Sequence, residues 1–345
     1  MKFLFDTRRY TIFTISVLVL FQLTFAKYCW VSDDYDPAQW FIDRSCGNST
    51  ADNSKIEEEG FSIIHRSQNF LSNKRIVMIG DSLTRYQYLN LIRSLHTNSW
   101  EFGDYPILEH EKEWEDWKHF YLGSRNRFGC REICDCHRYY DRNSRENRHY
   151  FDSRRNITIH NLNYAPGLGI YGSNFPTSAN FSELCMDFNI AQEFPRIHDE
   201  AATSHDWYHY DHTDFIQNRI APLNADVLII NFGHLGQIYT KKTVDDFEKS
   251  FFETARKSAR HLIWKSTTAR CDRHGALDPG GFLNSLESDG VTIFDAYAIT
   301  EHVARKNFED PIARNKVCWD NLHFNSFVYR ELNKEFLLLL ENILH

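Results

Sequence analysis

The sequence predicts an α/β protein built around a central parallel sheet of about five strands. Short apolar runs alternate along the chain with amphipathic stretches, which is the pattern of strands joined by covering helices. No internal repeat interrupts this alternation, and 42% hydrophobic residues in a chain of 345 can fill one sizeable core. The runs that we expect to form strands are 75–80, 157–164, 226–231, 261–268 and 291–297.

Three stretches between or after these runs predict helices that cover the sheet. After the first run, apolar side chains recur every three residues, as a core-facing helix requires. They are Leu83, Tyr86, Leu89, Ile92 and Leu95. The second helix is expected over 243–259 and the third over 326–344, each with an apolar stripe on one side. Helices of this kind cover the faces of a parallel sheet, so they support the α/β class.

Two regions lack this alternation of apolar runs and amphipathic stretches. Residues 100–155 are rich in charged and aromatic side chains and contain Cys130, Cys134 and Cys136, so we interpret them as a disulfide-containing insertion that overhangs the sheet. Ligand clefts of open α/β sheets lie beyond the carboxyl ends of the strands, where such an insertion would wall a substrate groove. Residues 28–73 are interpreted as an N-terminal wrap, so that 27–345 would form a single domain.

The first 26 residues, 1–26, predict a signal peptide or a signal anchor. Basic residues precede an apolar run from Tyr10 to Ala26, with small residues near a cleavage position. Both readings send the chain into the secretory pathway lumen, in the ER or Golgi, or out of the cell, and the second gives a single-pass type II membrane anchor. An even number of cysteines, 8, fits disulfide formation there. Sequons at Asn48, Asn156 and Asn180 fit a glycoprotein.

The charge balance argues against a nucleic-acid partner, and no metal site is expected. The formal net charge is -8, and no long basic stripe is present. The cysteines of the stretch 130–137 lack the spacing of a structural zinc site. A histidine-rich stretch, 196–215, is interpreted as a solvated loop or a groove wall, rather than as a metal site; its aromatic residues would stack on sugars or join the core.

Gly80, Asp81 and Ser82 follow directly after the first expected strand, where a helix begins. Glycine permits a tight turn at such a point, and a serine at a helix N-terminus lies among backbone N–H groups that favour negative charge. The local sequence leaves two readings of Ser82 open, because a serine here serves either as a nucleophile or as the N-cap of the helix. Asp81 is expected to brace the turn.

Two further motifs supply partners for such a serine. Asn231 and Gly233 end the run 226–231; a side-chain amide there donates to an oxyanion, and glycine lets the backbone approach a ligand. A local turn bond that ends the strand is the alternative reading of Asn231. Asp320 and His323 lie just before the last expected helix, at a spacing that lets a carboxylate orient an imidazole.

These three motifs, in this order, resemble the SGNH hydrolase superfamily and, within it, the PC-esterase and trichome birefringence-like branch. The similar segments are "KRIVMIGDSLTRYQ", "ADVLIINFGH" and "CWDNLHF". The resemblance covers about residues 28–345 and implies a three-layer, flavodoxin-like SGNH fold. It also implies that Ser82 is the nucleophile, His323 the general base and acid, and Asp320 the orienting carboxylate.

The same resemblance implies the parts around these residues. The backbone N–H of Ser82, together with Asn231 and Gly233, would form the oxyanion hole. Arg85 would either meet an acyl or sugar oxygen or serve a structural role. His234 matches a histidine of the branch and is placed with the substrate.

The implied function is transfer of an acetyl group to a hydroxyl of a glycan through an acyl-Ser82 intermediate, with no bound cofactor. The acyl donor stays open between acetyl-CoA and an acetyl ester. Hydrolysis of carbohydrate acetyl esters by the same residues is one alternative, and a secreted glycan-binding protein without turnover is another. The chain departs from plant members of the branch at Leu235 and Gly236 and at Phe324 and Asn325, where they carry tryptophan or cysteine; these departures bear on the polysaccharide substrate.

Overall fold

The computed structural model divides into two units, Met1–Glu59 and Gly60–His345. The residues that it describes all belong to the second unit: 63–100, 131–137, 145–165, 169–170, 212–231, 233, 251–272, 290–309, 317–318 and 320–345. The expected signal segment, 1–26, and most of the expected wrap lie outside these residues. Within them, no helix has the length and apolar character needed to cross a membrane.

A mixed sheet lies at the centre of the second unit. Its parallel strands are β1 (Arg75–Gly80), β4 (Ile157–Ala165), β6 (Ala225–Ile230), β7 (Ala259–Lys265) and β8 (Thr292–Phe294). They lie in the order β4-β1-β6-β7-β8, and each neighbouring pair runs parallel. Every one of them falls on an apolar run that the sequence marks as a strand, so the α/β class and the parallel sheet are confirmed.

At one edge the sheet continues with antiparallel strands from the region 100–155. β2 (Glu132–His137) pairs with β3 (Arg145–Asp152), β3 pairs with β4, and the short β5 (Gly169–Ile170) also pairs with β4. In its described part this region therefore extends the sheet; the predicted disulfide-containing overhang falls largely on 101–130 and 138–144, which lie outside the described residues. Two of its charged side chains lie inside the fold: Arg148 Nη1 and Glu132 Oε1 are 3.0 Å apart, and both side chains are fully buried.

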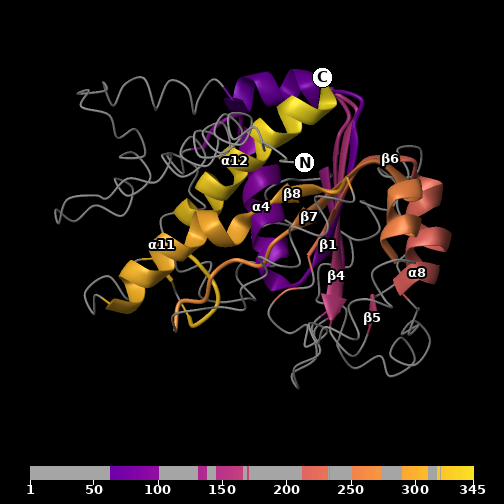
Figure 1. The fold of residues 1–345 in the computed structure, drawn as a ribbon. Helices are drawn as coiled ribbons and strands as arrows, with labels where there is room; N and C mark the ends of the chain where they lie inside the picture. Colours follow the sequence, from indigo (N-terminus) through magenta and orange to yellow (C-terminus); the bar gives the residue numbers. More distant parts are fainter. Residues whose placement is uncertain are drawn as a thin grey trace, which may run out of the picture. The chain divides into compact units, whose positions relative to one another are not determined.

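Helices cover both faces of the sheet and give three layers (Figure 1). α4 (Ser82–Thr97), α11 (Ala296–Glu309) and α12 (Ser326–Leu344) lie on one face. α8 (His212–Phe215), the π-helix Ile216–Ile220 and a helix at 251–258 lie on the other. The expected first and last helices are α4 and α12, and 251–258 is the described part of the helix expected over 243–259.

The core between the sheet and the second helix layer is apolar. Its buried members include Val77, Ile79, Leu162, Phe215, Leu228, Ile230, Phe251 and Trp264. Full burial of one such side chain contributes about 1.5–3 kcal/mol. On the opposite face α4 and α12 pack against each other, and Asn333 Nδ2 donates to the Gln87 carbonyl oxygen and to Asn90 Oδ1. These contacts hold α12 against α4.

Asparagines in the left-handed conformation precede three of the parallel strands. Asn73, Asn156 and Asn224 have φ values of 59°, 54° and 50°. Asparagine tolerates this region because its short polar side chain bonds locally, so each turn brings the chain sharply into the next strand. Asn156, the sequon residue, is exposed; Asn48 and Asn180 lie outside the described residues.

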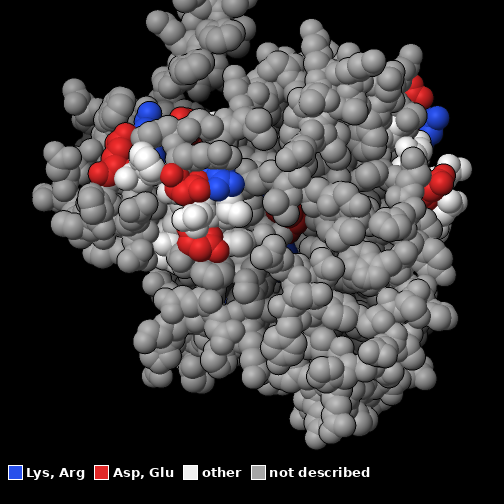
Figure 2. All heavy atoms as spheres, turned by 90° about the horizontal axis from the view of Figure 1, so that it is seen from below, with Lys and Arg blue, Asp and Glu red and all other residues white. Residues whose placement is uncertain are grey.

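Figure 2 views the molecule from below, where acidic and basic side chains lie side by side on the described surface.

Candidate active site

The turn from β1 into α4 carries Asp81 and Ser82. Asp81 is the N-cap of α4: its Oδ1 accepts from the Leu83 N–H at 3.0 Å, and its carbonyl accepts from the Arg85 N–H at 3.0 Å. The two readings of Ser82 are thereby separated, because a carboxylate caps the helix and the serine is its first residue. The hydroxyl of Ser82 is left for another partner.

That partner is His323. Ser82 Oγ and His323 Nε2 are 2.7 Å apart although 241 positions separate the residues. His323 Nδ1 lies 2.6 Å from Asp320 Oδ2. An ionised carboxylate accepts only, so it keeps the proton on Nδ1 and leaves Nε2 to accept from the serine. The three residues thus form a Ser–His–Asp hydrogen-bond chain in the geometry used by serine hydrolases.

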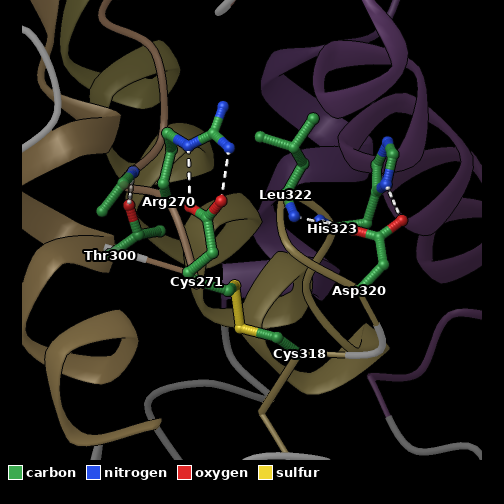
Figure 3. The surroundings of a disulfide bond; sticks show 9 residues. Arg270, Cys271, Thr300, Cys318, Asp320, Leu322 and His323 are labelled. Carbon is green, nitrogen blue, oxygen red and sulfur yellow. Dashed lines mark hydrogen bonds and ion pairs between the residues drawn. A yellow bond between two sulfur atoms is a disulfide. The ribbon is translucent and has the colours of Figure 1, made fainter. Parts of the chain in front are cut away.

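The loop between Asp320 and His323 is closed by its own hydrogen bonds (Figure 3). Asp320 Oδ1 accepts from the backbone N–H groups of Leu322 and His323, each at 2.7 Å. Burial by itself raises the pKa of Asp320, but the hydrogen bonds from His323 and from these backbone groups outweigh it and hold the pKa below its ordinary value. Asp320 is therefore an ionised acceptor at neutral pH.

The imidazole of His323 also rests on an aromatic ring. Tyr86 of α4 meets it edge to face, with ring centroids 5.1 Å apart, and Tyr86 in turn packs on Tyr329 of α12 at 5.7 Å. Tyr86 is fully buried. The apolar pattern predicts Tyr86 in the core stripe of the helix but does not predict its contact with the histidine. Its position one helical turn after Ser82, on the same face, is the signal that marks it.

A disulfide holds the same loop from the other side. Cys271 and Cys318 are bonded (Figure 3), and the N–H of Cys271 donates to the carbonyl of Asn321 at 3.1 Å. Cys318 also forms an isolated antiparallel bridge with Phe324. The loop that carries Asp320 and His323 is therefore pinned to the segment that follows β7.

Asn231 is occupied by contacts within the protein. Its Nδ2 donates to the Lys265 carbonyl at 2.9 Å and to Thr267 Oγ1 at 3.2 Å. Its Oδ1 accepts from the Gly233 N–H at 3.0 Å and from Thr84 Oγ1 at 3.3 Å. Both donors that Asn231 was expected to offer an oxyanion are thus used, and so is the N–H of Gly233. In this structure Asn231 joins the ends of β6 and β7 to α4, and the expected part of Asn231 and Gly233 in an oxyanion hole stays a prediction.

Gly233 and Gly80 allow the close packing of this turn. Gly233 has φ 68°, and a Cβ added to it would lie 1.9 Å from Asp81 Oδ2. A Cβ added to Gly80 would lie 2.2 Å from Thr84 Oγ1. Among the described residues, the backbone N–H of Ser82 has no hydrogen-bond partner. That N–H, at the positive end of the α4 dipole, is the donor left for negative charge beside Ser82.

Arg85 and His234 are the two residues expected to contact the substrate, and the structure describes only the first of them. Arg85 is 2% exposed, with its guanidinium carbon 5.8 Å from the centroid of the Tyr86 ring, which favours the structural role. His234 lies outside the described residues, as does the histidine-rich stretch before His212. Among the described side chains, no group of three or more metal-binding residues is assembled.

Comparison with protein-family models, with curated proteins and with solved structures gave no match to this chain.

Proposed function

We propose that this chain is a serine-dependent acyl-transfer enzyme with Ser82 as its nucleophile. The observation that carries the proposal is the hydrogen-bond chain in which Ser82 Oγ meets His323 Nε2 at 2.7 Å and His323 Nδ1 meets Asp320 Oδ2 at 2.6 Å. A serine hydroxyl is a weak nucleophile until an adjacent base takes its proton, and the base needs a third group to orient it.

The reaction proceeds in two halves. Ser82 Oγ adds to the acyl carbon of an ester while its proton passes to His323 Nε2, and the tetrahedral intermediate collapses as His323 returns that proton to the departing alcohol. An acceptor hydroxyl then loses its proton to His323 as it attacks the acyl-Ser82 ester, and the second tetrahedral intermediate collapses as His323 returns that proton to Ser82 Oγ. The N–H of Ser82 stabilises the oxyanion, where one donor contributes about 10²–10³ in rate.

Asp320 stabilises the imidazolium that forms in each half. Its lowered pKa keeps it ionised when His323 gains a proton, so the pair lies as carboxylate and imidazolium at the tetrahedral stage. Tyr86 holds the ring at the correct tilt for transfer to and from Ser82. A glycan-binding protein without turnover would need none of these contacts, so they favour the enzyme.

We assign the fold to the SGNH, flavodoxin-like type. In chain order the parallel strands run 2-1-3-4-5 across the sheet, the order that flavodoxin-like proteins share. Ligands of such sheets bind where the order reverses, between the first and third strands. These strands are β1 and β6, whose carboxyl ends lead into Ser82 and Asn231.

We assign the acyl group as acetyl and the acceptor as a glycan hydroxyl in the secretory pathway. The support for this assignment is the resemblance of "KRIVMIGDSLTRYQ", "ADVLIINFGH" and "CWDNLHF" to the PC-esterase and trichome birefringence-like branch. The same acyl-Ser82 ester yields an esterase if water attacks it, so acceptor choice alone separates transferase from hydrolase.

A fluorophosphonate probe tests the nucleophile. The probe should label the wild-type chain and fail to label Ser82→Ala, while His323→Ala should lower the labelling rate by about 10²-fold or more because the base is lost. Ser72→Ala is a matched control, since its hydroxyl donates to the Arg155 carbonyl at 3.1 Å and accepts from Asn73 Nδ2 at 3.5 Å, and it should label as wild type. Unchanged labelling of Ser82→Ala would overturn the assignment.

The acceptor is tested with an acetyl ester donor. Intact mass should show one acetyl adduct on the wild type and none on Ser82→Ala. Adding glycan acceptors should divert acetyl groups from free acetate to acetylated glycan. Acetate release that no acceptor changes would replace the transferase with an esterase.

A further inference from the structure

A buried lysine lies beneath the Asp81–Ser82 turn. Lys265 is the last residue of β7 and is 1% exposed. Its Nζ donates to Thr84 Oγ1 at 3.3 Å, in the first turn of α4. A buried ammonium is costly, because removal from water disfavours its charged form, and lysine is seldom buried without a partner. Burial accordingly lowers the pKa of Lys265 to about 8, against the attraction of the Asp81 carboxylate.

Lys265 is connected to the site through a closed set of hydrogen bonds. Thr84 Oγ1 accepts from Lys265 Nζ and donates a hydrogen bond to Asn231 Oδ1, each at 3.3 Å. Asn231 donates back to the Lys265 carbonyl at 2.9 Å and accepts from the Gly233 N–H. The side chain and backbone of Lys265 therefore hold both the first turn of α4 and the end of β6.

The donors and acceptors around Lys265 show which protonation state of its side chain fits the site. An ammonium has three donors and no acceptor, so it matches Thr84 and attracts Asp81 as an ion. A neutral amine loses the attraction to Asp81, whose carboxylate caps the helix that presents Ser82. A methionine of similar length would fill the volume without the burial cost, so the packing of the turn alone does not account for a lysine.

We propose that Lys265 is a positioning residue of this site: its buried ammonium holds Thr84 by a hydrogen bond and Asp81 by charge, and supports Asn231 through Thr84, so that Ser82 stays aligned with His323 and turnover requires the ammonium. The inference rests on the proposed acyl-transfer function. Lys265 acts through its neighbours and does not touch the triad.

The charged neighbours define the expected pH dependence. Asp81, from the turn, is the titratable group whose charge acts on Lys265. Thr84 from α4 and Asn231 after β6 do not titrate. Tyr329 of α12 interacts with Asp81 but stays neutral, because burial raises its pKa well above its ordinary value. The ammonium is present below its pKa and lost above it, so activity should fall as pH rises through about 8.

The test is the pH profile of kcat for 4-nitrophenyl acetate with the full chain, after subtraction of Ser82→Ala. Lys265→Arg keeps the charge at every pH and should abolish the alkaline fall. Lys265→Met removes the charge and should lower kcat about tenfold or more at neutral pH, with KM changed less, as expected when the reacting groups lose alignment. Lys257→Met, on the exposed face of the helix at 251–258, should match wild type.

The outcomes separate the two proposals. An inactive wild type that no probe labels overturns the proposed function itself. An active wild type with an alkaline fall that persists in Lys265→Arg, or a Lys265→Met chain with wild-type kcat, overturns only the role of Lys265. If Lys265→Met does not fold, as judged by its circular dichroism and Tm, the Lys265→Arg profile decides alone.

Discussion

Cys271 and Cys318 join the segment after β7 to the loop that carries Asp320 and His323. The two Cα atoms are 6.3 Å apart, and both side chains are buried. Removing the bond as Cys271→Ser/Cys318→Ser should lower kcat about 10- to 100-fold, because small displacements of reacting groups cost that much. The free energy of unfolding should fall by about 4 kcal/mol, as expected for a closed loop with a sequence separation of 47.

Two measurements check this, because loop alignment and global stability are separate effects. Turnover and fluorophosphonate labelling are followed well below the Tm of the variant, and urea unfolding gives the stability. Ser72→Ala removes a hydroxyl outside this loop and serves as the control for effects of purification and assay conditions. A variant with wild-type kcat would show that the backbone bonds from Asp320 position His323 without the disulfide.

Gly233→Ala should damage the Ser82 turn through Asp81. The added Cβ meets Asp81 Oδ2 at 1.9 Å, and the backbone has φ 68°, where an L-residue costs about 1–2 kcal/mol. Displacing Asp81 removes the cap of α4, which contributes about 0.5–2 kcal/mol more. We expect a loss of labelling at Ser82 together with a Tm below that of wild type.

The chain offers a matched control at Gly290. Its φ is 77°, but a Cβ there would meet nothing within 4 Å. Gly290→Ala should lose stability because an L-residue is placed at a positive φ, but its Cβ clashes with no other atom. Labelling of Ser82 should therefore be unchanged. Equal labelling of the two alanine variants would mean that Asp81 does not position the nucleophile.

The parallel sheet could be predicted because its strands are buried on both faces and read as unbroken apolar runs. β6 is buried at every position, and the run before Asn231 shows it. The last run was read as a strand to residue 297, whereas β8 ends at Phe294 and α11 begins at Ala296. Asp295 Oδ1 accepts from the Ala298 N–H at 3.1 Å, so a side-chain bond ends the strand earlier than the apolar pattern suggests.

The antiparallel edge could not be predicted in the same way. Glu132, Asn147 and Arg148 are buried in β2 and β3, and polar strands of this kind give the pattern of a solvated loop. Glu132 and Arg148 pair with each other only after residues 16 positions apart come together, and Asn147 Oδ1 accepts from the Asn163 N–H of β4. Local sequence carries no signal for such a pair.

In the candidate site, too, one part could be predicted from the sequence and another could not. The order of Ser82, Asn231 and the Asp320/His323 pair could be read from the sequence, because each follows a recognisable strand or precedes a helix. The allocation of hydrogen bonds could not be read. Whether Asn231 donates to a ligand or to Lys265 depends on side chains that only the folded chain brings into contact.

His149 and His160 predict a stability that falls in mild acid. They face each other across β3 and β4 with Nδ1 atoms 2.8 Å apart, and each side chain is 1% exposed. One Nδ1 must donate and the other accept, so at least one ring is neutral. Burial, the neighbouring His149 and Arg75 hold the pKa of His160 well below its ordinary value.

A group whose folded pKa lies below its unfolded pKa binds more protons when unfolded, so its contribution to stability is lost as pH falls. The free energy of unfolding should therefore decrease below about pH 6.5, by at most about 1.4 kcal/mol per pH unit for this group. Urea unfolding at a series of pH values measures the slope. His160→Gln keeps a polar side chain that does not titrate and should flatten it, while His65→Gln, at an exposed position, should not. A slope that His160→Gln leaves intact would place the acid sensitivity at other groups.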